Sequence, residues 1–217
     1  MPVDQLAQIP FLLDLGKIEV DKLIIFILSV LAAITVNAEG QAAMATTLGD
    51  IQKESKDRFH FNPLFHLDIS GLLCFFVAGF GWPRHVPIEA NNFKHPSVYL
   101  ILSRFAGPLA NLLLAGIAGS IIWVTRVIGV EDQVFTILLS VNLMVFVFNF
   151  LPIPPLAGAS LFFPLLPKKM NPGGRLVRRV FPPLLVLVFI ILRLNHIDIV
   201  NDALYPVVRG LFDFLAG

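Results

Sequence analysis

The feature of this sequence that most limits its fold is a series of long apolar stretches. They lie at about 22–48, 97–126, 133–153 and 178–195. A helix needs about 20 apolar residues to cross a hydrocarbon core of about 30 Å, so each stretch predicts a transmembrane helix. A shorter apolar segment near 198–216 is predicted either to span the membrane or to lie at its interface. The expected fold class is an all-α multi-pass membrane protein.

The composition agrees with a bilayer location and excludes other classes of protein. Of the 217 residues, 56% are hydrophobic and 14% are charged, which is too apolar for an ordinary soluble domain. The formal net charge of +1 and the lack of a basic stripe argue against a nucleic-acid partner. The single cysteine, Cys74, excludes an intrachain disulfide and a thiolate zinc cluster. The first expected partner is therefore the lipid bilayer.

Basic residues predict the orientation of the chain in the membrane. The connection after the third long stretch carries no acid among its basic residues, Lys168, Lys169, Arg175, Arg178 and Arg179. The positive-inside bias then predicts that the loop 168–179 is cytoplasmic, in a prokaryotic cytoplasmic membrane, and that the acidic N-terminus faces out. We expect three regions: an N-terminal interfacial segment at 1–21, a membrane core at 22–167, and a C-terminal region at 168–217 that holds the basic loop and the last membrane helices.

The stretch between Asp50 and Pro96 differs from the rest of the chain. It contains four prolines, most of the histidines, and an apolar piece from His66 to Trp82 that is marginal as a membrane span. Non-helical backbone at membrane depth survives only when protein or a wet cavity surrounds it. We therefore expect a short helix or a small irregular or β re-entrant element, covered by the long helices.

Four blocks of sequence carry a more specific pattern. The first, at 34–50, reads Asn-Ala-Glu-Gly-Gln at 37–41 and ends in Leu-Gly-Asp. The second, at 61–87, begins Phe-Asn-Pro-Leu-Phe-His-Leu-Asp, and the third, at 106–111, reads Ala-Gly-Pro-Leu-Ala-Asn. The fourth, at 149–158, reads Asn-Phe-Leu-Pro-Ile-Pro-Pro-Leu-Ala-Gly. In this order and spacing, the blocks resemble the membrane-embedded site-2 protease family of intramembrane zinc metalloproteases across about residues 30–167.

The resemblance implies a site-2-protease-like helical core, but the chain departs from the family at the catalytic positions. Active members bind Zn²⁺ through two histidines four residues apart on one helix face, and the glutamate after the first histidine is the general base. An aspartate of the fourth block supplies the third ligand. The matching ligand positions here are Asn37, Gln41 and Ala157, and Ala38 replaces the base. Neutral amides are poor zinc ligands and alanine is none, so we expect neither an intact catalytic set nor a zinc cofactor.

Glu39 and two histidines are candidates for a replacement site. A carboxylate at membrane depth is costly and is a functional candidate by default. Glu39 lies about 160–200° around the helix from the face of Asn37 and Gln41, so it cannot simply replace the general base. The alternatives to a functional role are that Glu39 pairs with a basic residue, faces a wet cavity or stays protonated. His66 fits the second block and His60 is particular to this chain; each suits a loop or cap role as well as a ligand role. These alternatives stay open from the sequence.

The amides that stand at the ligand positions predict a buried polar cluster. Asn37 and Gln41, at positions i and i+4 of one helix, can bond to each other and to amides on neighbouring helices. The amides on other predicted helices are Asn111, Asn142 and Asn149. We expect Asn37, Gln41 and Asn111 to form one cluster, because a buried amide without a partner costs about 1–3 kcal/mol.

Residues 80–88, here called the edge segment, resemble the family segment that lies beside the active cleft. An extended edge can pair with an unwound peptide by strand addition; the alternative is an interfacial loop anchored by Trp82 and Arg84. We take the binding candidates of the scaffold to be Glu39, His66, Trp82, Asn111, Asn149 and Pro154.

The favoured function is that of a catalytically inactive family member that binds a transmembrane peptide or a membrane protein partner. The alternative is an active intramembrane metalloprotease with a rearranged metal site built from Glu39 and His66 or His60. A small transporter is a third interpretation, and no internal repeat in the sequence supports it.

Overall fold

The computed structural model describes residues 19–51, 59, 61–130, 132–161, 173–195, 197 and 203–217, with side chains for all of these except 173–179. Residues 1–18 of the interfacial segment expected at the N-terminus, His60, and residues 168–172 of the basic loop lie outside this part of the chain. The rest of the expected loop, 173–179, is already helical, because α5 begins at Gly173. The helices are α1 (Val20–Thr47), η4 (Pro63–His66), α2 (Ile69–Ala78), η5 (Ala90–Asn92), α3 (Pro96–Val127), α4 (Gln133–Phe148), η6 (Ala157–Leu161), α5 (Gly173–Leu194) and α7 (Tyr205–Ala216).

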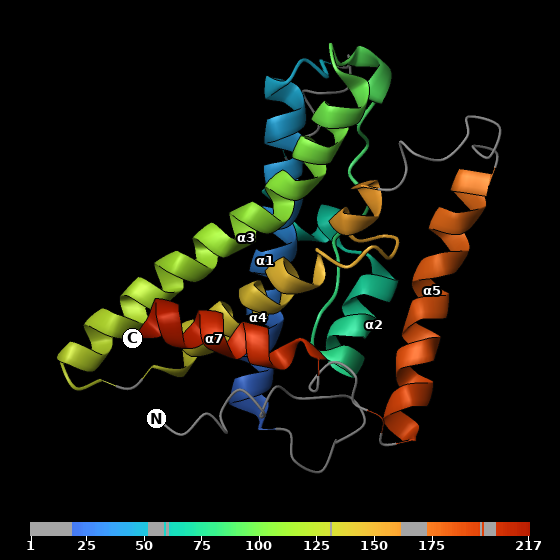
Figure 1. Ribbon diagram of the computed structural model, residues 1–217. Coiled ribbons are helices and arrows are strands. Elements are labelled where there is room, and N and C mark those ends of the chain that lie inside the picture. The colour runs from blue at the N-terminus through green and yellow to red at the C-terminus, as the bar shows by residue number, and fades with distance from the viewer. Residues whose placement is uncertain are drawn as a thin grey trace.

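Two long helices, α1 and α3, cross at the centre of the molecule (Figure 1). Both are long and apolar enough to cross a membrane. Their close approach depends on glycine: a Cβ at Gly40 of α1 would lie 2.8 Å from the backbone oxygen of Ala106. A Cβ at Gly107 of α3 would lie 2.6 Å from Oδ1 of Asn37. Small residues therefore bring the two backbones together at the height of Asn37.

The direction of the helices follows the alternation that the sequence predicts. In Figure 1, α1 ends, α3 begins and α5 begins at the same end of the molecule. Asp50, just after α1, accepts hydrogen bonds from the backbone N–H of Glu89 at 3.0 Å and from Nδ2 of Asn92 at 2.8 Å. Because Asp50 is fully buried, this contact joins the end of α1 to the approach to α3. The stretch between the two helices thus returns to the end where it started.

The prediction of a helix at 133–153 is wrong at its C-terminal end. Asp132 caps the helix by accepting the backbone N–H of Val134 at 2.6 Å, and α4 ends at Phe148. Pro152, Pro154 and Pro155 follow at once; proline lacks a donor and restricts the residue before it, so the helix cannot continue.

Helix α7 lies across α3 and α4 (Figure 1). Its 12 residues span only about 18 Å at about 1.5 Å per residue, which is too short to cross a bilayer alone. Of the two roles expected for the segment near 198–216, a span is therefore excluded for the helical part that the structure describes.

The region between α1 and α3 contains the short helix expected as one alternative. Asp68 caps α2 by accepting the backbone N–H of Gly71 at 2.8 Å, and the helix ends at Gly79, whose φ of 78° suits glycine. The edge segment then runs back along η4, where the backbone N–H of Arg84 donates to the backbone oxygen of His66 at 2.7 Å. No strand occurs among the described residues, so the element is irregular and helical and contains no β-structure there.

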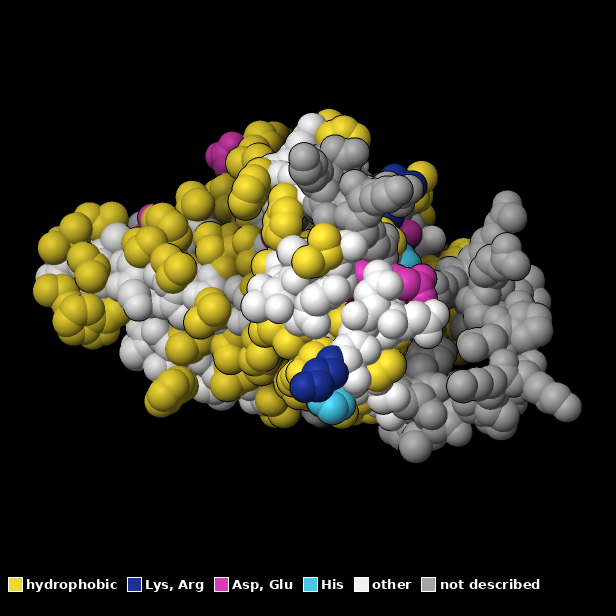
Figure 2. All heavy atoms as spheres, turned by 90° about the horizontal axis from the view of Figure 1, so that it is seen from above, with side chains coloured by type: hydrophobic (Ala, Val, Ile, Leu, Met, Phe, Trp, Pro, Cys, Tyr) yellow, Lys and Arg dark blue, Asp and Glu magenta, His cyan; other side chains and the backbone are white. Residues whose placement is uncertain are grey.

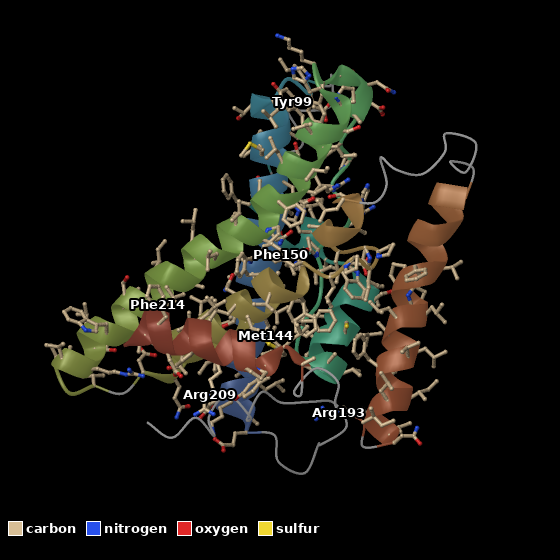
Figure 3. All side chains as sticks on the ribbon, viewed as in Figure 1. Tyr99, Met144, Phe150, Arg193, Arg209 and Phe214 are labelled. Atoms are coloured by element: carbon tan, nitrogen blue, oxygen red, sulfur yellow. The ribbon has the colours of Figure 1, made fainter. Side chains whose placement is uncertain are left out.

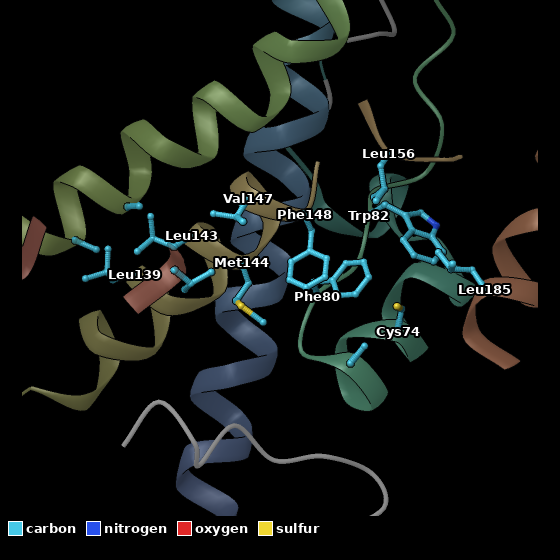
Figure 4. Packing of buried hydrophobic residues seen from close by; sticks show 14 of the residues in the cluster. Cys74, Phe80, Trp82, Leu139, Leu143, Met144, Val147, Phe148, Leu156 and Leu185 are labelled. Atoms are coloured by element: carbon cyan, nitrogen blue, oxygen red, sulfur yellow. The ribbon is translucent and has the colours of Figure 1, made fainter. Parts of the chain in front are cut away.

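The main apolar core is formed by residues of α2, α3, α4, α5 and α7 and by the start of the edge segment (Figure 4). The ring of Phe80 stacks on that of Phe148 with centroids 3.7 Å apart. Trp82 belongs to the same core and is 3% exposed, so the interpretation of Trp82 as an interfacial anchor is wrong. The indole of Trp82 is buried because it packs against the apolar side chains of this core, whereas Arg84, two residues later, is exposed.

Apolar side chains also cover much of the outer surface. Figure 2 shows hydrophobic side chains over much of one face, with few charged groups. On α3, the outward residues Leu109, Leu113 and Ile117 are 49%, 71% and 59% exposed. Figure 3 shows Arg193 and Arg209 toward the opposite end of the molecule from Tyr99. Such a surface is unusual for a protein in water.

Candidate functional site

The site begins with two amides on one face of α1. Asn37 and Gln41 are separated by one helical turn, and Nε2 of Gln41 donates to Oδ1 of Asn37 at 2.8 Å. Asn37 is fully buried and Gln41 is 7% exposed. This pair occupies the two positions that the resemblance matches to histidines.

Two further amides extend the pair across the bundle. Nδ2 of Asn37 donates to Oδ1 of Asn111 on α3 at 2.7 Å. Asn111 in turn donates from Nδ2 to Oδ1 of Asn142 on α4 at 2.8 Å and to the backbone oxygen of Ala33 on α1 at 2.9 Å. We call Gln41, Asn37, Asn111 and Asn142 the amide cluster. The prediction that Asn37, Gln41 and Asn111 share one cluster is confirmed, and Asn142 adds a third helix.

The amide cluster has a defined direction. At one end, Nδ2 of Asn142 donates to the backbone oxygen of Leu138 at 2.8 Å, which leaves its Oδ1 to accept. At the other end, Nη1 of Arg104 donates to Oε1 of Gln41 at 2.7 Å. A guanidinium can only donate and a carbonyl can only accept, so the two ends together fix the orientation of every amide between them. Reversing any one amide would place donor against donor.

Arg104 is a residue of this site that the sequence reasoning missed. It lies on α3, is half-buried, and reaches the amide cluster from the edge-segment side, where its Nη2 contacts Nε2 of His85 at 3.2 Å. Because arginine has no acceptor, Nε2 of His85 can take part in this hydrogen bond only as the acceptor. The available signal was an arginine inside a predicted membrane helix, which is a functional candidate in its own right.

The position matched to the general base is covered by the edge segment. Ala38 and Ala42 of α1 form a small buried cluster with Val86, and Ile88 packs against it. Ala38 is fully buried and Val86 is 6% exposed. The methyl group of Ala38 thus faces apolar side chains at the place where the family would have a carboxylate.

Asn149 and Ala157, both of the fourth block, bind each other. The backbone N–H of Ala157 donates to Oδ1 of Asn149 at 3.1 Å, and the N–H of Gly158 donates to its backbone oxygen at 2.7 Å. Nδ2 of Asn149 donates to the backbone oxygen of Val145 at 2.7 Å. Asn149 therefore joins the end of α4 to η6 and makes its described bonds outside the amide cluster. Pro154 lies half-buried in the intervening turn.

Glu39 and His66 form a separate buried pair. Oε1 of Glu39 and Nε2 of His66 lie 3.1 Å apart, and the two residues are 9% and 7% exposed. The pair joins α1 to η4 on a different face of α1 from Asn37 and Gln41. Of the roles left open for Glu39, pairing with a basic residue is the one that the structure contains.

The residues at this site do not fit a zinc ion. A catalytic zinc needs three good donors and one open position. Asn37 and Gln41 present amides whose oxygens already accept hydrogen bonds, and Ala157 has no donor atom in its side chain. Across the part of the chain that the structure describes, no three His, Cys, Asp or Glu side chains converge. Glu39 and His66 by themselves supply only two donors.

The comparison with known proteins indicates the family of this chain. No protein-family model matches the chain, and no solved structure matches it. A Bacillus subtilis (strain 168) protein, named "Putative zinc metalloprotease YwhC", is 34% identical over 158 residues, which are 69% of this chain and 70% of that protein. The chain belongs to this family of site-2-protease-like zinc metalloproteases.

Proposed function

We propose that this protein is a catalytically inactive member of the family that acts in the membrane by binding a transmembrane peptide or a membrane protein partner. The observation that supports the proposal is the amide cluster closed by Arg104. Hydrogen-bonded amides, Asn37 and Gln41, occupy the positions matched to the histidines. Ala38 and Ala157 occupy the positions matched to the general base and the third ligand.

The chemistry of these residues argues against hydrolysis. Peptide cleavage by this family's type of site needs a water made acidic by a metal and a base to take its proton. Ala38 cannot take a proton, and Val86 covers it. Neither task has a residue at the matched positions.

A binding role fits the retained scaffold. The edge segment is not helical. Its Val86 packs on Ala38 and Ala42, and the backbone N–H of Arg84 donates to the backbone oxygen of His66. A peptide unwound from a transmembrane helix has free backbone groups that an extended segment can bind. We place the protein in a prokaryotic cytoplasmic membrane with the loop 168–179 in the cytoplasm, in keeping with its two candidate spans and its apolar surface.

An active metalloprotease with a rearranged site is the second candidate, favoured by the Glu39–His66 pair. A buried carboxylate and imidazole 3.1 Å apart could both ligate a metal after a small rotation. A third donor would have to come from outside the described residues, where His60 lies.

Zinc content separates the two candidates. The wild-type protein, purified in mild detergent, is expected to contain far less than one zinc per chain by elemental analysis. Zinc near one per chain, lost in Glu39→Ala or His66→Ala, would contradict the proposal and support the rearranged site.

Partner binding is tested by photo-crosslinking in native membranes. A photoreactive residue at Ile88 of the edge segment is expected to give a discrete crosslinked species. Leu113, which is 71% exposed on the outer face of α3, is the matched control and should give only lipid adducts. Equal results at the two positions would contradict a binding role for the edge segment.

A further inference from the structure

Arg104 places a permanent positive charge beside Gln41, the residue matched to the second histidine ligand of the family. Its Nη1 lies 2.7 Å from Oε1 of Gln41, which stands at the position of the second histidine. A histidine at position 41 would present its ring nitrogen within a few ångströms of the same guanidinium. Any cation bound by that ligand would therefore share a half-buried space with Arg104.

The guanidinium of Arg104 stays protonated. A lysine or histidine so placed can lose its proton when a metal binds, whereas arginine stays protonated in proteins. In the wild-type protein the side chain contacts Gln41 and His85, and of these two partners His85 is kept in variants that carry Gln41→His. At an effective dielectric constant of about 20, repulsion between a guanidinium and a Zn²⁺ placed about 5 Å away would lower zinc affinity by a factor on the order of 10⁵.

We propose that Arg104 is a fixed cationic barrier that excludes divalent metal from this site, so that restoring the ligand side chains alone does not restore zinc binding. The inference rests on the proposed function and extends it. It assigns the absence of metal to Arg104 on α3 as well as to the missing ligands.

The test compares two variants that differ at one residue. The ligand-restored variant carries Asn37→His, Ala38→Glu, Gln41→His and Ala157→Asp, and the second variant adds Arg104→Leu. After equilibration with zinc and removal of free metal, we expect well below one zinc per chain in the first and near one in the second. Arg104→Lys in the same background should give an intermediate value, because lysine keeps the charge but can lose its proton.

The matched control removes a positive charge from a neighbouring element. Arg84 is an exposed arginine of the edge segment, so Arg84→Leu in the ligand-restored background should leave zinc content low. Equal zinc content with and without Arg104→Leu, or an equal rise with Arg84→Leu, would overturn the inference.

A smaller change keeps the test informative where the ligand-restored protein does not fold. Histidines at i and i+4 of a helix chelate transition metals, so Asn37→His with Gln41→His creates a two-ligand site. Addition of Ni²⁺ should raise the thermal midpoint of this double variant only when Arg104→Leu is also present. An equal rise with Arg104 intact would overturn the inference.

The outcomes for the inference and for the proposed function are separate. Zinc in the wild-type protein that is lost in His66→Ala contradicts the proposed function and leaves the Arg104 comparison in force. Equal zinc in the two ligand-restored variants contradicts the inference and leaves the proposed function standing.

Discussion

Asn37 on α1 donates its Nδ2 to Oδ1 of Asn111 on α3 at 2.7 Å, at the place where the two long helices come closest through glycine. Side-chain hydrogen bonds between membrane helices contribute about 0.6 kcal/mol on average. A structural zinc contributes about 10–16 kcal/mol in zinc-finger peptides. Amides cannot equal a metal as a crosslink, so the cluster must rely on the close packing that surrounds it.

Asn111→Leu should destabilise the protein, because the Asn111 side chain binds three partners on α1 and α4. Leucine has a similar volume but leaves Nδ2 of Asn37 and Oδ1 of Asn142 without these partners. We expect the free energy of unfolding to fall by about 1–3 kcal/mol for each buried group, measured by reversible unfolding in mixed micelles. Asn195→Leu is the control and should change little, because Asn195 is an exposed amide directly after α5 whose Nδ2 donates to the backbone oxygen of Ile191. Equal effects of the two substitutions would argue against a stabilising cluster.

Gly107→Ala should be far more harmful than Gly116→Ala, although both glycines lie within α3. The new methyl group at 107 would meet Oδ1 of Asn37 at 2.6 Å and its backbone oxygen at 2.7 Å. At Gly116, nothing lies within 4 Å, and alanine favours a helix by about 0.5–1 kcal/mol over glycine. We therefore expect a lower thermal midpoint for the first variant and an unchanged or higher one for the second. Equal midpoints would show that α1 and α3 are not in close contact at Asn37.

The helices and the cluster follow from local patterns that a sequence displays. The apolar stretches predicted the ends of α1 and α3 to within two residues. The i, i+4 spacing of Asn37 and Gln41 predicted the hydrogen bond between them. The contact between Gln41 and Arg104 was harder to predict, because the two residues are 63 positions apart and meet only through the crossing of α1 and α3. Trp82 was misplaced for a similar reason: an aromatic residue beside proline suits an interface as well as a core, and only tertiary packing decides between them.

Labelling of single cysteines should place the basic loop in the cytoplasm. The structure shows that α1 ends and α3 and α5 begin at one end of the molecule, but it does not show which side of a membrane this end faces. The basic residues of 168–179 predict the cytoplasmic side. In a Cys74→Ala background, Met170→Cys should react with a membrane-impermeant thiol reagent only after the membrane is opened. Labelling of intact cells would show that the topology is inverted.

Glu39 and His66 should be energetically coupled independently of metal. Their atoms lie 3.1 Å apart in a buried contact between α1 and η4, so each residue determines how well the other is accommodated. In a double-mutant cycle of Glu39→Gln and His66→Phe, we expect a coupling free energy of about 0.5–3 kcal/mol, unchanged by a chelator. Glu39→Gln combined with His95→Phe is the control. His95 is an exposed histidine packed against Tyr99, so this pair should be additive within about 0.5 kcal/mol. Coupling that disappears on chelation would mean that a bound metal joins Glu39 and His66, and the rearranged metal site would then become the better account of this protein.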